Sequence, residues 1–272
     1  MTLAHPAIRS PRSPRAPWRW AWAGATVGLC LGVLLCAPAQ WLARSLAWAS
    51  QGQLQLQDAR GTVWQGSAQL VLTGGSGSRD AQALPGRIHW TLQPLRTEPQ
   101  LALSADCCMS APLLLRLSPA WPGAQVHISD TPSTWPAALL SGLGAPWNTL
   151  QPEGDLTLVP QQLSLQWHSS QWRPQGRLQL TARDMASRLS TLKPMGTYVV
   201  EIANANTAPG GAVVTLSTVS GALVLTGQGQ WQGQHLRFRG EASAAPAHEA
   251  ALDNLLSIIG RRDGARSLLS WG

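Results

Sequence analysis

The chain has 272 residues, of which 44% are hydrophobic, so it can build a sizeable core as one large or two small domains, and intrinsic disorder is excluded. Only 12% of the residues are charged, and the net charge is +7. Four of these positive charges are Arg9, Arg12, Arg15 and Arg19, and the chain has one lysine, Lys193. Because arginine is not concentrated after residue 43, the composition excludes nucleic-acid binding through a basic stripe as the main function.

The first element is an uncharged segment over residues 20–43. As an α-helix rising about 1.5 Å per residue, this segment would extend roughly 36 Å, which is enough to cross a bilayer core. We therefore predict a transmembrane helix over 20–43. The arginines before it place residues 1–19 in the cytoplasm as a short Arg/Pro-rich tail, and residues 51–272 on the other side of the membrane as one domain.

A cleaved signal peptide is the alternative interpretation of this segment. The tripeptide Ala37-Pro38-Ala39 has the small-x-small form of a cleavage site. However, the apolar run before it is longer than a usual signal-peptide core, and proline is awkward inside the site. Cys30 and Cys36 would lie about 240° apart around the helix, so we interpret both as apolar filler rather than as a bridge or ligand pair.

Cys107 and Cys108 are adjacent in the sequence. Neighbouring Cα atoms lie about 3.8 Å apart, below the usual lower limit for a disulfide. We therefore expect two strand residues that face opposite ways, with an intermolecular disulfide as the alternative.

Beyond residue 51 the hydrophobic pattern changes to period two, which is typical of half-buried antiparallel strands. Glycine or proline separates most of these runs, as turns and bulges require. The clearest predicted strands cover Gln53–Gln57, Ile88–Leu92, Leu101–Leu103, Asp155–Leu158, Leu163–Trp167, Arg177–Leu180, Val214–Leu216 and Leu236–Phe238. The pattern predicts a mainly β body.

Three segments depart from period two and predict helices. Trp135–Leu143 and Ala186–Leu192 are expected to be short helices, each bounded by proline or glycine. Near the C-terminus, apolar residues at i, i+3, i+4 and i+7 predict an amphipathic helix, with Gly260 as its C-cap before Arg261 and Arg262. Its apolar stripe is Leu252, Leu255, Leu256 and Ile259.

The sequence offers no convincing catalytic or metal-binding pattern. The six histidines are scattered singly and lack zinc-ligand spacing. Ser190 and Lys193 fit a Ser-x-x-Lys motif, but the chain has no second lysine for the Lys-Thr-Gly element that accompanies it. Glu153 and Asp155 fall at a turn, where acidic residues are commonly solvated. We predict no enzyme activity, no catalytic, cofactor-binding or metal-binding residues, and no cofactor.

Several segments together resemble one bacterial family. They are Gly61-Thr62-Val63-Trp64-Gln65-Gly66, Leu84 to Trp90, Leu192 to Tyr198, and above all Leu252 to Arg262. In order and spacing these resemble protein N of the type II, or general, secretion system. The resemblance implies a single-pass inner-membrane protein with a short cytoplasmic tail and a curved, antiparallel β-rich periplasmic portion. It also implies a role in the machine that moves folded exoproteins through the outer membrane.

Two functions from different classes remain open. The first is a structural or assembly component whose partners are the inner membrane, the inner-membrane platform of the secretion system and the outer-membrane secretin, and no nucleic acid. The second is a lipid-handling module, because the family also resembles AsmA-type periplasmic proteins, whose curved sheets offer an apolar groove to acyl chains. A continuous groove lined by apolar side chains would favour lipid, whereas a filled interior with exposed edge strands would favour protein partners.

Overall fold

A computed structural model describes residues 18–94, 98–120, 123–168, 171–204, 212–232 and 235–271. The chain divides into two compact units, Met1–Ala37 and Pro38–Gly272. The predicted tail over residues 1–19 lies almost entirely outside the described residues, and the predicted domain boundaries at residues 19, 43 and 51 stay predictions.

The prediction of one continuous helix over residues 20–43 is wrong, because this segment contains parts of two helices. Helix α1 covers Trp18–Leu35 and helix α2 covers Ala39–Ala49. The break has a local cause, because Pro38 lies in an extended conformation and disfavours helical backbone in the residue before it. Both Cys30, in α1, and Cys36, in the turn after it, are free thiols. In the described part of the chain, no helix combines the length and the apolar character needed to cross a membrane.

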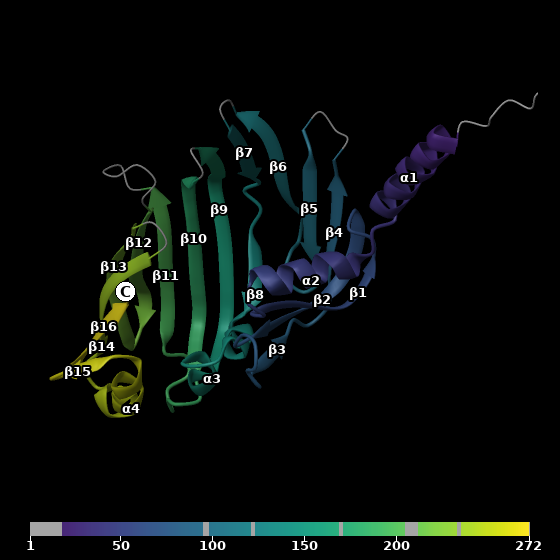
Figure 1. Ribbon diagram of the computed structural model, residues 1–272. Coiled ribbons are helices and arrows are strands. Elements are labelled where there is room, and N and C mark those ends of the chain that lie inside the picture. The colour runs from purple at the N-terminus through teal and green to yellow at the C-terminus, as the bar shows by residue number, and fades with distance from the viewer. Residues whose placement is uncertain are drawn as a thin grey trace, which may run out of the picture. The chain divides into compact units, whose positions relative to one another are not determined.

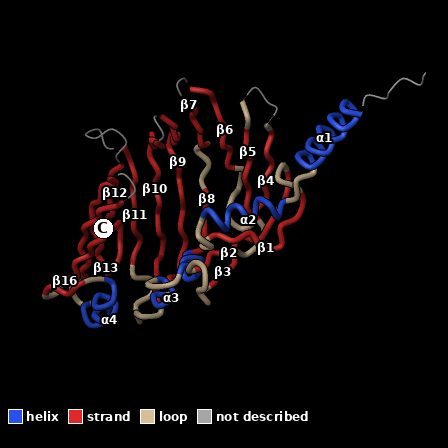
Figure 2. Tube along the Cα trace, viewed as in Figure 1, coloured by secondary structure: helices blue, strands red, loops and turns tan. Residues whose placement is uncertain are grey.

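The second unit is built on one open sheet of 16 strands, which are antiparallel in every described pairing (Figures 1 and 2). The strand order is β1-β2-β4-β5-β6-β7-β9-β10-β11-β12-β13-β14-β16-β15, with β3 on β2 and β8 on β9. Most strands therefore pair with their sequence neighbours, as short connections favour. The bounds are β1 Leu54–Gly61, β2 Gln65–Thr73, β3 Ala81–Ala83, β4 Ile88–Gln93, β5 Gln100–Ala105, β6 Leu113–Ala120, β7 Gly123–Ile128, β8 Ser133–Pro136, β9 Pro152–His168, β10 Gln171–Ser187, β11 Gly196–Asn204, β12 Ala212–Gly221, β13 Leu223–Gln232, β14 His235–Ala244, β15 Arg261–Asp263 and β16 Arg266–Trp271.

The predicted strands are confirmed, with one change in their number. Asp155–Leu158 and Leu163–Trp167 belong to the same strand, β9, which runs beside the equally long β10. The ladder between them shifts register near Gln162, which has a positive φ of 49°. An irregularity of this kind bends a strand without ending it. The alternation of apolar residues is therefore interrupted there, although the strand continues.

The two short predicted helices differ from expectation. Ala137–Leu143 forms a 3₁₀ helix, η1, followed by α3 over Trp147–Leu150, whereas Trp135 belongs to strand β8. The predicted helix over Ala186–Leu192 is wrong. Ala186 and Ser187 complete β10 by pairing with β9, and the Ser187 hydroxyl donates to the Leu150 carbonyl at 2.6 Å. Strand pairing therefore overrides the local helical preference at this point.

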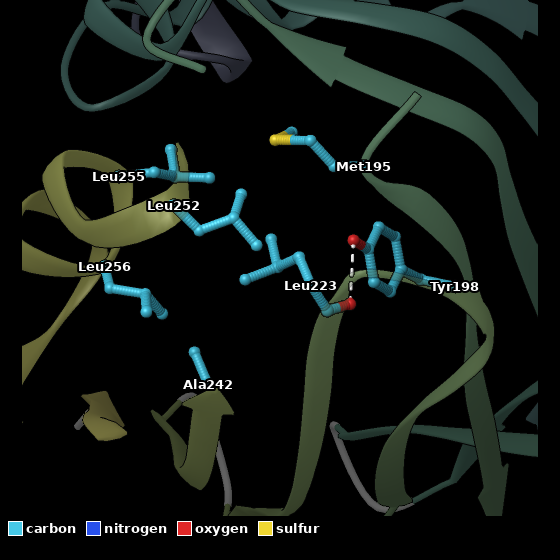
Figure 3. Close-up of a cluster of buried hydrophobic side chains, with 7 residues drawn as sticks. All are labelled: Met195, Tyr198, Leu223, Ala242, Leu252, Leu255 and Leu256. Carbon is cyan, nitrogen blue, oxygen red and sulfur yellow. Dashed lines mark hydrogen bonds between the residues drawn. The ribbon is translucent and has the colours of Figure 1, made fainter. Parts of the chain in front are cut away.

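The C-terminal amphipathic helix is confirmed as α4, Glu249–Ile259, and Gly260 is its C-cap residue. Its stripe of Leu252, Leu255 and Leu256 is at most 2% exposed and packs on Tyr198, Leu223 and Ala242 of the sheet (Figure 3). Arg261 and Arg262 begin strand β15 directly after the helix. The Arg262 guanidinium bonds back to the Asp253 carboxylate of α4 at 2.6 Å.

Two further hydrophobic clusters lie elsewhere on the sheet. Helix α2 contributes Ala39, which packs with Ala68 of β2 and Trp90 of β4. Helix η1 contributes Leu139, which packs with Leu84 and other buried residues. Among the described residues of the second unit, one cluster thus lies under α2, one under η1, and one under α4, with Leu150 of α3 packed beside it.

Candidate functional site

The register of the ladders sorts polar and apolar side chains onto opposite faces of the sheet. Side chains alternate between faces along a strand, and directly paired residues share a face. One paired row across β10 to β14 is polar and consists of Gln179, Glu201, Thr215, Gln228 and Arg239. The neighbouring row on the other face is apolar and consists of Leu178, Ile202, Val214, Gly229 and Phe238.

The apolar row continues across the rest of the sheet. In the first half, Leu92, Leu101, Leu115 and Ile128 are directly paired in succession, and Leu117, Val126 and Leu165 form a second such row. We call the resulting surface the apolar face. It consists of Leu92, Leu101, Leu103, Leu115, Leu117, Val126, Ile128, Leu165, Trp167, Leu178, Leu180, Val200, Ile202, Val214, Leu216 and Phe238.

The helices cover only part of the apolar face. Leu101 and Leu103 pack against the cluster of α2, and Leu216 packs against the cluster of α4. Farther from the helices, Leu117 remains 41% exposed and Trp167 remains 39% exposed. The apolar face is therefore a candidate binding surface, because exposed apolar side chains gathered on one surface mark sites of interaction.

Glycines shape one end of this face. Phe238 on β14 lies against Gly227, Gly229 and Gly240, and a Cβ at Gly227 would collide with the phenyl ring. The absence of side chains at these positions lets the ring lie flat along the strands. The sequence shows these glycines, but it does not reveal that one aromatic ring requires them.

An apolar pocket of about 290 Å³ lies where the sheet meets α3 and α4. Its walls come from α3, from the sheet and from α4, and Ser187 is one of the few polar residues among them. The walls include Trp147, Leu150, Met185, Met195, Leu225, Leu255 and Ile259. Such a pocket is suited to an apolar group, because it supplies few hydrogen-bonding partners for a polar one.

Tyr198 forms part of the pocket wall and is engaged in the fold. Its hydroxyl donates a hydrogen bond to the Leu223 carbonyl at 3.1 Å (Figure 3). Burial raises the pKa of the Tyr198 phenol well above its usual value, because the apolar surroundings disfavour the phenolate. The phenol is therefore neutral at physiological pH and fixes β11 to the start of β13.

Ion pairs at the surface connect neighbouring elements. Arg60 and Arg87 both bond Asp58, and these bonds lower the pKa of the Asp58 carboxyl. His89 pairs with Asp106 at 3.1 Å and lowers the pKa of that carboxyl. Four of the five side chains are substantially exposed, and Arg87 is less so. Each pair therefore contributes modestly to stability.

The residues of the rejected Ser-x-x-Lys motif are engaged in other contacts. The Ser190 hydroxyl donates to the Ala251 carbonyl at 3.4 Å, while the Lys193 ammonium bonds both Glu153 oxygens at 2.8 and 3.0 Å. Lys193 thereby lowers the pKa of the Glu153 carboxyl. Among the described residues, no three His, Cys, Asp or Glu side chains gather in a group suited to a metal ion. The prediction of no catalytic or cofactor residues stays a prediction.

The expectation for Cys107 and Cys108 is wrong. The two residues form a disulfide with each other, with Cα atoms 3.7 Å apart, in the turn between β5 and β6. The prediction applied the spacing of ordinary disulfides, which join distant segments of chain. Adjacent cysteines in a turn close a small ring of their own, which that spacing does not describe.

Comparison with known families gives one match. A family model described as type II secretion system (T2SS), protein N, matches residues 52–268, which include all of β1 to β15. No curated protein matches the chain, and no solved structure matches it.

Proposed function

The chain belongs to the type II secretion system protein N family, and we propose that it is an assembly component of that machine in the cell envelope. The observation that carries this proposal is the family match over residues 52–268, which covers almost the whole sheet. The partners that we propose are other components of the machine, namely the inner-membrane platform and the outer-membrane secretin.

The apolar face offers a surface for such assembly. It extends across many strands, and Leu117 lies at a point where helices leave it open. At the sheet edges, β15 is short and consists of charged, exposed residues, whereas β1 has eight residues with a register shift beside Asp58. Charges and bulges discourage strand addition at an edge, so, contrary to our expectation, the edges do not favour protein partners, and the apolar face is the surface that we propose for them.

A single-pass inner-membrane anchor is part of the same proposal. Residues 20–37 carry no charge, four arginines precede them, and the α1 side chains Leu29 and Leu35 are more than 60% exposed. A cytoplasmic N-terminus and a periplasmic sheet follow from the positive-inside rule. A reporter that is active only in the periplasm, fused after Gly272, should be active, and activity of a cytoplasm-only reporter there would contradict the orientation.

The test of the secretion role is deletion of the gene in its own host. Exoproteins should then accumulate in the periplasm and be depleted from the medium, and the full-length chain should restore export. Normal export in the deletion strain, at normal levels of the other components, would contradict the proposal. A photoreactive residue at position 117 should crosslink to another secretion component, with position 127 on the opposite face as the control.

A second candidate function is the binding of an acyl chain, as in a lipid-handling module. Two observations favour it, namely the apolar face itself and the 290 Å³ pocket beside α4, whose walls are almost entirely apolar. In this candidate the sheet would shield the apolar part of a lipid from water, and the burial of each methylene group would contribute about 0.8 kcal/mol.

Two matched variants separate these candidates. Leu117→Asp places a charge on the apolar face at a position that is already 41% exposed, so the fold should tolerate it. His127→Asp introduces the same charge on the adjacent strand and the opposite face. If lipid is the ligand, mass spectrometry of the purified chain should detect bound lipid in the wild type and in His127→Asp, and less of it in Leu117→Asp. If only proteins bind there, no lipid should copurify with any variant, and, with the photoreactive residue moved to the directly paired position 126, Leu117→Asp alone should lose the crosslinked partner.

A further inference from the structure

We propose that the Cys107–Cys108 disulfide is a site of thiol–disulfide exchange with a dithiol reductant, and that the reductant attacks the sulfur of Cys107. The inference is independent of the proposed secretion role, because it rests only on the turn between β5 and β6 and on the residues that contact it.

The first argument is that this disulfide is poorly suited to stabilising the fold. A disulfide stabilises mainly by restricting the unfolded chain, and the effect grows with the length of the loop that it closes. Cys107 and Cys108 are one residue apart, so their bond joins no distant segments. Reduction should therefore leave the global stability almost unchanged, unlike the reduction of a disulfide that joins two elements.

The second argument is the unequal exposure of the two cysteines. Cys107 is exposed, whereas Cys108 is only 6% exposed and packs in a cluster with Leu84 and Leu139. A hollow of about 610 Å³, bordered by both cysteines and by Thr134, leaves room beside the bond, so the difference in exposure alone distinguishes the two residues. Because exchange depends on which sulfur a thiolate can reach, attack is directed to Cys107, and Cys108 is the leaving group.

The third argument is that the surrounding turn can hold the reduced pair in place. The Cys108 amide donates to the Ala105 carbonyl at 3.1 Å, and the Cys108 carbonyl accepts from the Thr134 amide of β8 at 2.8 Å. These bonds do not involve the sulfurs, so they can persist after reduction. The two thiols then remain neighbours, which favours closing the ring again and makes the exchange reversible.

The exchange balances as follows in atoms and electrons. One thiolate of the reductant bonds the Cys107 sulfur, the Cys107–Cys108 bond breaks, and Cys108 leaves as a thiolate that takes up a proton. The second thiolate of the reductant then attacks its own partner sulfur in the mixed disulfide and releases Cys107, which also takes up a proton. The chain gains two electrons and two protons, and the dithiol is oxidised to a disulfide.

The first experiment uses the full chain with Cys30→Ala and Cys36→Ala, so that Cys107 and Cys108 are the only cysteines. The protein is treated with dithiothreitol without denaturant, alkylated with iodoacetamide and analysed by mass spectrometry. We expect two labels after reduction, none before it, and none after reoxidation with oxidised dithiothreitol. The thermal midpoint should change by less than about 3 °C. A bond that resists reduction until the chain is unfolded, or a larger fall in the midpoint, would overturn the proposal.

The second experiment separates the two sulfurs in the same background. In folded Cys108→Ala, the remaining Cys107 should react with N-ethylmaleimide at least about tenfold faster than the remaining Cys108 in folded Cys107→Ala. Both variants should react at similar rates once unfolded in guanidinium chloride, which controls for the reagent. Equal rates in the folded proteins would remove the assignment of Cys107 as the attacked sulfur.

Discussion

Individual residues matter most where the backbone adopts a positive φ, which glycine tolerates better than other residues. Gly221 ends β12 with φ at 129°, and a Cβ there would collide with the Gly196 backbone of the neighbouring strand. Gly264 also has a positive φ, 63°, but no atom lies within 4 Å of where its Cβ would be. Substituting each glycine in turn therefore distinguishes the cost of a steric collision from the cost of a positive φ alone.

We predict that Gly221→Ala destabilises the chain by more than Gly264→Ala does. Both changes strain the backbone, at a cost of about 1 to 3 kcal/mol, but only the first also forces two strands apart. Denaturant unfolding measures the difference. Equal free energies of unfolding for the two variants would show that the close approach of Gly221 and Gly196 is unimportant.

A second prediction concerns Tyr198, which is the only tyrosine in the chain, so the rise in phenolate absorbance, measured against Tyr198→Phe to subtract the tryptophans, reports its ionisation. Its pKa is raised in the folded state, so the folded chain keeps this proton at a pH where the unfolded chain loses it. Stability should therefore be fully present below about pH 10, the usual tyrosine value, and should fall as the pH rises above it.

The measurement is an alkaline titration of the folded chain against the same chain in guanidinium chloride. Ionisation should begin near pH 10 in denaturant and at a higher pH, coincident with unfolding, in its absence. Tyr198→Phe should make the alkaline loss of stability less steep, while leaving the Leu223 carbonyl without its partner at a cost of about 1 kcal/mol near neutral pH. Coincident titration curves would contradict the burial argument.

At the scale of elements, α4 shows how an amphipathic pattern becomes a core. Leu252, Leu255 and Leu256 cover the sheet where Leu223 and Ala242 lie, and the Ser267 hydroxyl of β16 donates to the Leu256 carbonyl at 2.5 Å. The helix therefore packs directly against β14 and β16. Figure 3 shows these leucines directed toward the sheet residues.

We predict that Leu256→Ala costs about 2 to 5 kcal/mol, because Leu256 is 2% exposed and its removal leaves a cavity. Ile258→Ala on the same helix is the control, since Ile258 is 43% exposed, and it should cost less than about 1 kcal/mol. Arg261→Ala should also leave the cellular level of the protein near normal, because Arg261 is an exposed residue of β15. Protein level and thermal midpoint test the series. Normal stability of Leu256→Ala would contradict the packing of α4.

At the scale of the whole molecule, the chain divides before Pro38, so α2 belongs to the sheet unit although it follows α1 closely in sequence. Ala39 of α2 is 1% exposed against Ala68 and Trp90, and Leu42 packs beside them. The uncharged N-terminal segment thus contributes to both units.

This division predicts the behaviour of two truncations. A chain that begins at Pro38 should fold with the strand content and thermal midpoint of full-length protein in detergent. A chain that begins at Gln51 lacks α2 and exposes Trp90, so its midpoint should be lower by several degrees. Circular dichroism during heating measures both. Equal midpoints for the two truncations would show that α2 does not stabilise the sheet.

The sequence by itself determined the features that depend on local periodicity. Alternating residues such as Arg177–Leu180 predicted strands, and the stripe from Leu252 to Ile259 predicted α4, because neighbouring residues alone set which side chains share a face. The quoted segments from Gly61 to Arg262 were also sufficient to identify the family, which the match over residues 52–268 confirms.

Only the tertiary structure decided the features that depend on pairing between distant residues. The register aligns Leu178, Ile202 and Val214 into one apolar row, and no pattern within a single strand specifies that alignment. Pairing with β9 also kept Ala186 in a strand, where the local sequence predicted a helix. The apolar face and the pocket beside α4 arise in the same way, because residues from separate elements form them only after the sheet has assembled.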